Sequence, residues 1–140
     1  MARHDNKQLA ELLYQMLETE LGGEQVYKTA ISCAVNDDLK KEWKEYLDQT
    51  RHHQEVVLRL FEHFRLDPNA TTPGREVVAH TGKSLVQAME LAKAKASKGA
   101  AELVACECVV MAETKDHSNW ELLGRVATRA TGEDDGQGPL

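Results

Sequence analysis

The sequence predicts an all-α protein, a four-helix bundle, from three observations. Apolar residues recur at helical spacing over long stretches, the 140-residue chain contains only three prolines, and strand-like alternation of apolar and polar residues appears nowhere. The length suits one domain with a core of its own. Two long helices, a longer connection and two more helices are the order of two antiparallel helix pairs joined by a crossover loop.

The first helix pair comes from the N-terminal half of the chain. We expect one helix from about Asp5 to Val35 and a second that ends near Arg65. The turn between them, Asn36-Asp37-Asp38, contains residues that cap helix N-termini. Because this connection is so short, the two helices must lie antiparallel and in contact.

A linker rich in proline, threonine and glycine, residues 66–74, separates the two pairs and is long enough to cross one end of a bundle. The third helix is expected from about Arg75 to Ser97, and Gly99 marks the break before the fourth, which extends to about Thr131. Residues 1–131 should therefore form the bundle. The acidic, glycine-rich residues 132–140 are expected to be a disordered tail.

Charge and composition exclude several classes of function. A net charge of −6 argues against a nucleic-acid partner and against binding to an anionic membrane. No apolar run approaches the ~20 residues that cross a bilayer, and the N-terminus lacks the apolar core of a secretory signal, so we expect a cytoplasmic location. Three cysteines within helical patterns indicate reduced thiols. The chain has no glycine-rich phosphate loop, which leaves a nucleotide cofactor without support.

Acidic and histidine residues occupy places on the helical stripes where leucines are expected. A buried carboxylate without a partner costs several kcal/mol or takes up a proton, so a cation should lie between these faces, and a metal pair is the leading candidate. On the fourth helix the predicted inward row is Leu103, Cys106, Val110, Glu113, His117 and Trp120. The candidate metal ligands are Glu20, Glu24, His53, Glu107, Glu113 and His117.

The spacing of these residues departs from that of a di-iron carboxylate bundle. Such a bundle takes a Glu from each of two helices and a Glu-x-x-His pair from each of the other two. His53 is preceded at three residues by Thr50 in place of Glu, while Glu113 and His117 are four residues apart. The third helix offers no ligand on its expected inner face, which is Val77, Thr81, Leu85, Ala88 and Ala92.

Glu20 followed by Tyr27 resembles the metal ligand and neighbouring tyrosine of ferritins, and residues 18–27 and 112–121 resemble small bacterial ferritin-like proteins. The resemblance to the ferritin-like superfamily covers roughly Leu9 to Ala130. It implies iron or manganese, one or two ions between the first, second and fourth helices, redox chemistry with oxygen or peroxide, and Tyr27 beside the ligands. It also implies a homodimer or larger homo-oligomer. No sequence feature favours haem.

Each of these residues also has a plainer interpretation. Glu20 and Glu24 fit the rim of a core, and His53 fits a hydrogen-bonded core histidine. Glu113 with His117 fits a pair on the helix surface, and Tyr27 fits a core residue bonded to a carboxylate. The sequence leaves open whether the protein is an enzyme or a non-enzymatic interaction or dimerisation module with a degenerate or absent metal site. The interface of such a module would come from Trp43 and Phe61, or from Trp120.

Two glycines, Gly22 and Gly23, fall inside the first predicted helix, where each costs roughly 0.8–1 kcal/mol relative to alanine. One interpretation is a π-bulge or a close helix approach that aims Glu20 and Glu24. The other is tight packing against a bulky residue such as Trp43 or Trp120.

Overall fold

The computed structural model of the protein describes residues 3–131, and these residues form four helices with no strand. The helices are α1 (Arg3–Cys33), α2 (Asp37–His63), α3 (Pro73–Lys95) and α4 (Lys98–Thr131). The prediction of an all-α chain is confirmed for this part of the protein, and the helices begin and end within two residues of the expected bounds. The predicted tail, 132–140, lies outside the described residues. None of the four helices is long and apolar enough to cross a membrane.

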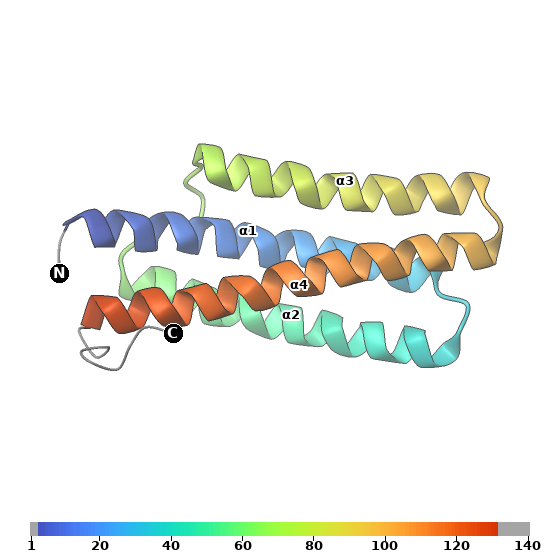
Figure 1. Ribbon diagram of the computed structural model, residues 1–140, viewed down its shortest axis with the longest axis horizontal. Coiled ribbons are helices and arrows are strands. Elements are labelled where there is room, and N and C mark those ends of the chain that lie inside the picture. The colour runs from blue at the N-terminus through green and yellow to red at the C-terminus, as the bar shows by residue number, and fades with distance from the viewer. Residues whose placement is uncertain (1–2, 132–140) are drawn as a thin grey trace.

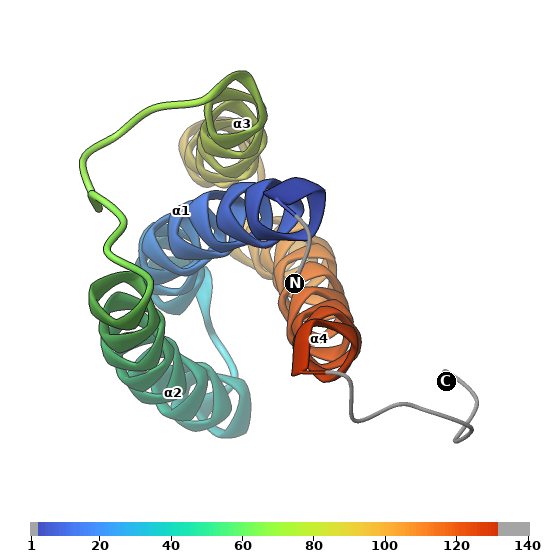
Figure 2. The same ribbon diagram turned by 90° about the vertical axis from the view of Figure 1, so that its left-hand side faces the viewer.

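Helix α1 lies at the centre of the bundle. It packs against α2, α3 and α4, whereas α2 makes its helix–helix backbone contacts with α1 alone. The end-on view shows α2 and α4 on either side of α1, with α3 covering another face (Figure 2). A polar group on the face of α1 between α2 and α4 can therefore meet side chains from three helices.

Successive helices run in opposite directions, so the three connections between them alternate between the two ends of the bundle (Figure 1). The turn between α1 and α2 is closed by Asn36, whose side chain accepts hydrogen bonds from the backbone N–H groups of Asp38 and Leu39. Glu102 of α4 accepts two further bonds from the backbone of Val35 and Asn36 at 2.6 and 2.7 Å. The start of α4 is thereby fixed to the end of α1.

The linker between α2 and α3 crosses one end of the bundle (Figure 2). Its path is held by Arg75, which is only 8% exposed. The Arg75 guanidinium pairs with Glu18 of α1 at 2.8 Å and donates to the linker carbonyls of Pro68 and Ala70 at 2.7 and 2.9 Å. Thr72 caps α3 by accepting the Arg75 backbone N–H. One buried arginine thus fixes both the linker and the start of α3.

The core consists of two apolar clusters. One surrounds Tyr27, Trp43 and Met89, and the other surrounds Met16 and Phe61. Trp43 is 3% exposed and Phe61 is 1% exposed. The prediction that these two aromatic residues form an interaction surface is therefore wrong, because both are already used to bind α2 to α1.

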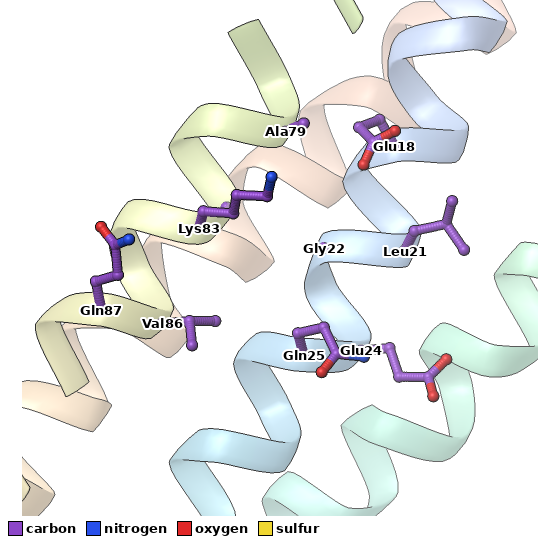
Figure 3. A pocket seen from close by; sticks show the side chains of 10 residues that line it. Glu18, Leu21, Gly22, Glu24, Gln25, Ala79, Lys83, Val86 and Gln87 are labelled. Carbon is purple, nitrogen blue, oxygen red and sulfur yellow. The ribbon is translucent and has the colours of Figure 1, made fainter. Parts of the chain in front are cut away.

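Gly22 of α1 faces Gly82 of α3, and the absence of side chains at both positions lets the two helices approach each other. A Cβ atom built on Gly22 would lie 3.9 Å from the Gly82 Cα, which is an ordinary contact between two backbones. Helix α1 is α-helical throughout, so a π-bulge is not formed. Of the interpretations given for the two glycines, close helix approach is the one observed, and Gly22 lines the groove beside it (Figure 3).

The expected inner face of α4 is rotated in the structure by about one residue, or roughly 100°. Leu103 and Val110, predicted to point inward, are 65% and 62% exposed. The buried positions are instead mostly small residues, which allow α4 to approach α1 and α3 closely: Ala101, Ala105, Cys108 and Val109.

The predicted face of α3 is also displaced. Val77, expected inside, is 65% exposed, while its neighbour Val78 is 9% exposed and Met89 is fully buried. The observed inner face of α3 begins at Arg75, a residue that the pattern of apolar residues does not include.

Candidate metal centre

Glu20 is an ionisable residue in the middle of an otherwise apolar row of α1. Leu13 and Leu17 precede it at helical spacing and are almost completely buried, so the same face carries Glu20 inward. Its exposed fraction is 2%. Glu20 therefore lies between α2 and α4, as the stripe on the first helix predicted.

His53 of α2 and Asp116 of α4 meet Glu20 at this position. The His53 Nδ1 atom is 3.5 Å from Glu20 Oε1 and 3.5 Å from Asp116 Oδ2. One ligand-type atom from each of the three residues lies within 4.8 Å of the other two. Three helices that are far apart in sequence thus contribute one donor atom each to one small volume.

Trp120 orients the two carboxyl groups. Its indole Nε1 donates to Glu20 Oε2 at 3.0 Å and to Asp116 Oδ1 at 3.2 Å. These are the oxygens that do not face His53, so the second oxygen of each group is directed toward the imidazole. The His53 ring also packs against Trp120, with ring centroids 5.2 Å apart. One tryptophan therefore holds all three members in position.

The His53 Nδ1 atom is buried and has no hydrogen-bond partner among the described residues. A buried polar atom of this kind is rare, because losing its hydrogen bond to water costs free energy. Here the atom faces one oxygen from each of two acids. The three groups together could hold a cation between them.

Burial raises the pKa of Glu20 to about 9, and the neighbouring Asp116 carboxylate adds to this effect through a hydrogen bond and charge repulsion. The Trp120 hydrogen bond acts in the opposite direction. Without a cation, Glu20 therefore carries a proton at neutral pH. A bound metal ion would replace that proton, since ligating carboxylates must be ionised.

A pocket of about 280 Å³ opens beside the three residues between α2 and α4. Thr50 and His53 reach it from α2, one helical turn apart, and Glu113 and Asp116 reach it from α4 at the same spacing. Two of the three residues, His53 and Asp116, line this pocket, and Glu20 lies behind them. Its remaining lining residues are Gln49, His117 and Trp120.

Tyr27 and Glu113 form a buried pair next to the three residues. The Tyr27 hydroxyl donates to Glu113 Oε1 at 2.6 Å, and Tyr27 is 2% exposed. Burial and this hydrogen bond raise the pKa of Tyr27 above its ordinary value. The charge of Glu113 also contributes to the raised pKa of Glu20. Tyr27 is thus a core residue bonded to a carboxylate, one of the two interpretations that its sequence context allowed.

Glu24, predicted as a ligand, lies outside this group. It accepts a hydrogen bond from Gln54 at 2.8 Å and pairs with Lys28 and Arg51 at 3.0 and 3.6 Å. The hydrogen bonds from Gln54 and Lys28 lower the pKa of Glu24. Its charge is therefore balanced by neighbouring side chains.

The predicted ligands of α4 take different places. Glu113 lines the pocket, but Glu107 is exposed and contributes to neither the pocket nor the three-residue group. His117 lies at the pocket rim with its side chain 77% exposed, and it pairs with Glu121 at 2.8 Å.

Asp116 is the member of the three-residue group that the sequence did not single out. Rotation of α4 by one position places Asp116, rather than His117, on the inner face. A signal for it was present in the spacing: Glu113-x-x-Asp116 repeats the three-residue interval of Glu-x-x-His with aspartate in the place of histidine.

Comparisons with protein-family models, with curated proteins and with solved structures found no match for this chain. The geometry of the site therefore carries the functional argument by itself.

Proposed function

We propose that this protein is a ferritin-like metal-binding bundle in which Glu20, His53 and Asp116 hold one divalent ion, iron or manganese. The observation that carries the proposal is the buried, unpartnered Nδ1 atom of His53 facing one oxygen of each of two carboxyl groups. Two carboxylates neutralise a divalent charge, which suits a site with little solvent. One imidazole with two carboxylates is a donor set that manganese and iron accept.

The residues around such an ion would have different roles. Glu20, His53 and Asp116 would bind it, and Trp120 would keep the carboxylates oriented through their other oxygens. The pocket would admit a small oxidant such as oxygen or peroxide. A bound iron or manganese ion would supply the redox chemistry. Glu113, one turn from Asp116, would be an additional carboxylate for a fourth ligand or a second ion.

The test is equilibrium binding of Mn²⁺, and of Fe²⁺ without oxygen, to protein first stripped of metal. Wild type should bind one ion per chain, and His53→Ala should weaken binding by about a hundredfold or more. His52→Ala is the matched control, since the adjacent histidine has a side chain that is 66% exposed and points toward Glu55. The control should bind like wild type. Equal binding by the two variants, or no binding by wild type, would contradict the proposal.

Exposed apolar residues support a second candidate function, self-association, for the outer faces of α3 and α4. Val77 and Leu91 of α3 are 65% and 57% exposed, and Leu103 and Val110 of α4 are 65% and 62% exposed. Large apolar side chains in such positions are typical of interaction surfaces when they are contiguous. Sedimentation equilibrium tests this candidate: a wild-type dimer that Leu103→Glu dissociates would support it, and a monomer at all concentrations would exclude it.

A further inference from the structure

A second cavity lies between α1, α3 and α4, separate from the pocket between α2 and α4. Its volume is about 80 Å³. Each of the three helices contributes apolar wall residues to it. These are Gly22, Gly23 and Val26 from α1, Val78, Gly82 and Leu85 from α3, and Met111 and Ala112 from α4.

The cavity exists because small residues gather at the crossing of α1 and α3. A Cβ atom built on Gly82 would meet only one neighbouring atom within 4 Å, the Gly22 Cα at 3.6 Å. No side chain of either glycine fills the space, and Ala112 of α4 leaves further room. Gly82 lines both this cavity and the wider groove beside it, so a larger side chain at position 82 would occupy space at the crossing.

Lys115 supplies a cationic donor to this apolar cavity. Its Nζ atom donates to Thr19 Oγ1 at 2.9 Å. Asn119 donates to the same oxygen at 3.1 Å, and the Thr19 hydroxyl in turn donates to the Gln15 carbonyl. An ammonium group has three N–H donors, and this is the one hydrogen bond that Lys115 makes among the described residues. It retains the capacity to bind an acceptor.

The acidic residue on the cavity wall does not use that capacity. Glu18 lines the cavity, but its Oε1 atom is paired with the Arg75 guanidinium at 2.8 Å. A wider groove of about 530 Å³ lies beside Gly22 as well, and Glu18 lines it too (Figure 3). That groove is open, and its second acid, Glu24, is paired with Lys28 and Arg51.

We propose that the cavity binds a short unbranched carboxylate, with its hydrocarbon chain against Val26, Val78 and Leu85 and its carboxylate on Lys115. The volume has room for about five or six water-sized groups, which corresponds to an acid of about five carbon atoms. This site uses none of the three residues of the proposed metal centre, although the charges of Asp116 and Glu20 act on Lys115. It would give the protein a small organic acid as a second ligand.

The experiment titrates pentanoate into metal-free protein and follows the methyl NMR signals of Val78 and Leu85. Pentanoate should shift these signals in a saturable way, and pentanol and pentylamine should bind at least about tenfold more weakly because a charge-assisted hydrogen bond is lost. Lys115→Met should weaken pentanoate binding by about tenfold or more, with a smaller effect on pentanol.

Filling the cavity provides an independent arm. Gly82→Leu should abolish the titration, and Gly124→Leu is its matched control because a Cβ atom at Gly124 meets nothing within 4 Å. If Gly82→Leu does not fold, Gly82→Ala should weaken pentanoate binding instead. The added Cβ atom would make an ordinary contact of 3.6 Å with the Gly22 Cα. The proposal is overturned if pentanoate causes no saturable shift in wild type, or if pentanol binds as tightly as pentanoate. Unchanged binding in Lys115→Met would also overturn it. Metal binding is measured separately, so either proposal can fail alone.

Discussion

Glu20 and Glu24 lie one turn apart on α1, yet their surroundings differ in every respect that matters for charge. Glu20 faces α4 and α2 at 2% exposure, beside a second acid and an unpartnered histidine nitrogen. Glu24 faces the other flank of α2 and is paired with Lys28 and Arg51. Burial raises the pKa of the first, and hydrogen bonds from Gln54 and Lys28 lower the pKa of the second.

The difference shows what distinguishes a candidate metal ligand from an ion-paired carboxylate on the same helix. The protein supplies cations to Glu24 from its own side chains, so this residue has no need of an external partner. Around Glu20 it supplies a second carboxylate and an imidazole instead. A carboxylate pair of this kind is stable only with a shared proton or a bound cation.

The largest difference between Glu20 and Glu24 is expected in metal affinity. Glu20→Gln should lower the affinity for Mn²⁺ by at least about a hundredfold, because it removes an ionisable donor from the site. Glu24→Gln should leave the affinity unchanged. Isothermal titration calorimetry of the two variants measures both. A larger loss in Glu24→Gln than in Glu20→Gln would reverse the assignment of the two residues.

The second largest difference between Glu20 and Glu24 should be in how each residue makes stability depend on pH. Folding raises the pKa of Glu20 from 4.5 to about 9, so between these values the folded state holds a proton that the unfolded state has released. The free energy of unfolding of metal-free protein should therefore fall as pH rises through this range, by at most about 1.4 kcal/mol per pH unit from this group.

Urea unfolding at several pH values measures this slope. Glu20→Gln should remove the fall, and Glu24→Gln should keep it. The lowered pKa of Glu24 acts in the opposite sense, since its stabilising effect is present above the ordinary pKa and is lost as the pH falls through the lowered one. Identical pH profiles for wild type and Glu20→Gln would show that Glu20 does not take up a proton on folding.

A smaller effect compares hydrogen bonds to carboxylates inside and outside the bundle. Tyr27→Phe leaves Glu113 without its donor in a partly buried place and should cost about 1–3 kcal/mol. Tyr46→Phe removes an exposed bond to Glu42, four residues away on the same helix, and should cost less than about 0.5 kcal/mol. Thermal unfolding of the two variants measures the difference. Equal losses would mean that burial adds nothing to the Tyr27–Glu113 pair.

The smallest effect concerns the outer ion pair. Arg51→Ala removes a contact of 3.6 Å between partly exposed groups and should change stability by less than about 0.5 kcal/mol. The pKa of Glu24, measured by NMR titration, should move toward its ordinary value. Mn²⁺ affinity should stay the same, and a clear loss of affinity would connect Glu24 to the metal centre.

The sequence predicted the helices and the inner face of α1 well, because large apolar residues mark only one side of that helix. The row through Leu13 and Leu17 led correctly to Glu20. The same reasoning placed the inner face of α4 incorrectly. Apolar residues surround most of its circumference, and its true inner face uses small residues such as Ala101 and Ala105. Periodicity of large side chains could not fix the rotation of such a helix.

The site was predictable only in part for the same reason. Glu20 and His53 could be chosen because each interrupts an apolar row on its own helix. The sequence does not indicate Asp116 as a ligand, because the predicted inner face of α4 lies one position away and presents His117 instead. The position of Glu24 on the helical stripe predicts a metal ligand. The sequence does not show that Gln54 and Arg51 reach this carboxylate from α2.

Crystals of the protein soaked with Mn²⁺ would test the central assignment most directly, through the anomalous scattering of the ion. The account predicts one strong peak per chain within bonding distance of Glu20 Oε1, His53 Nδ1 and Asp116 Oδ2. A well-occupied peak elsewhere with that position empty, or none at all at saturating Mn²⁺, would contradict it.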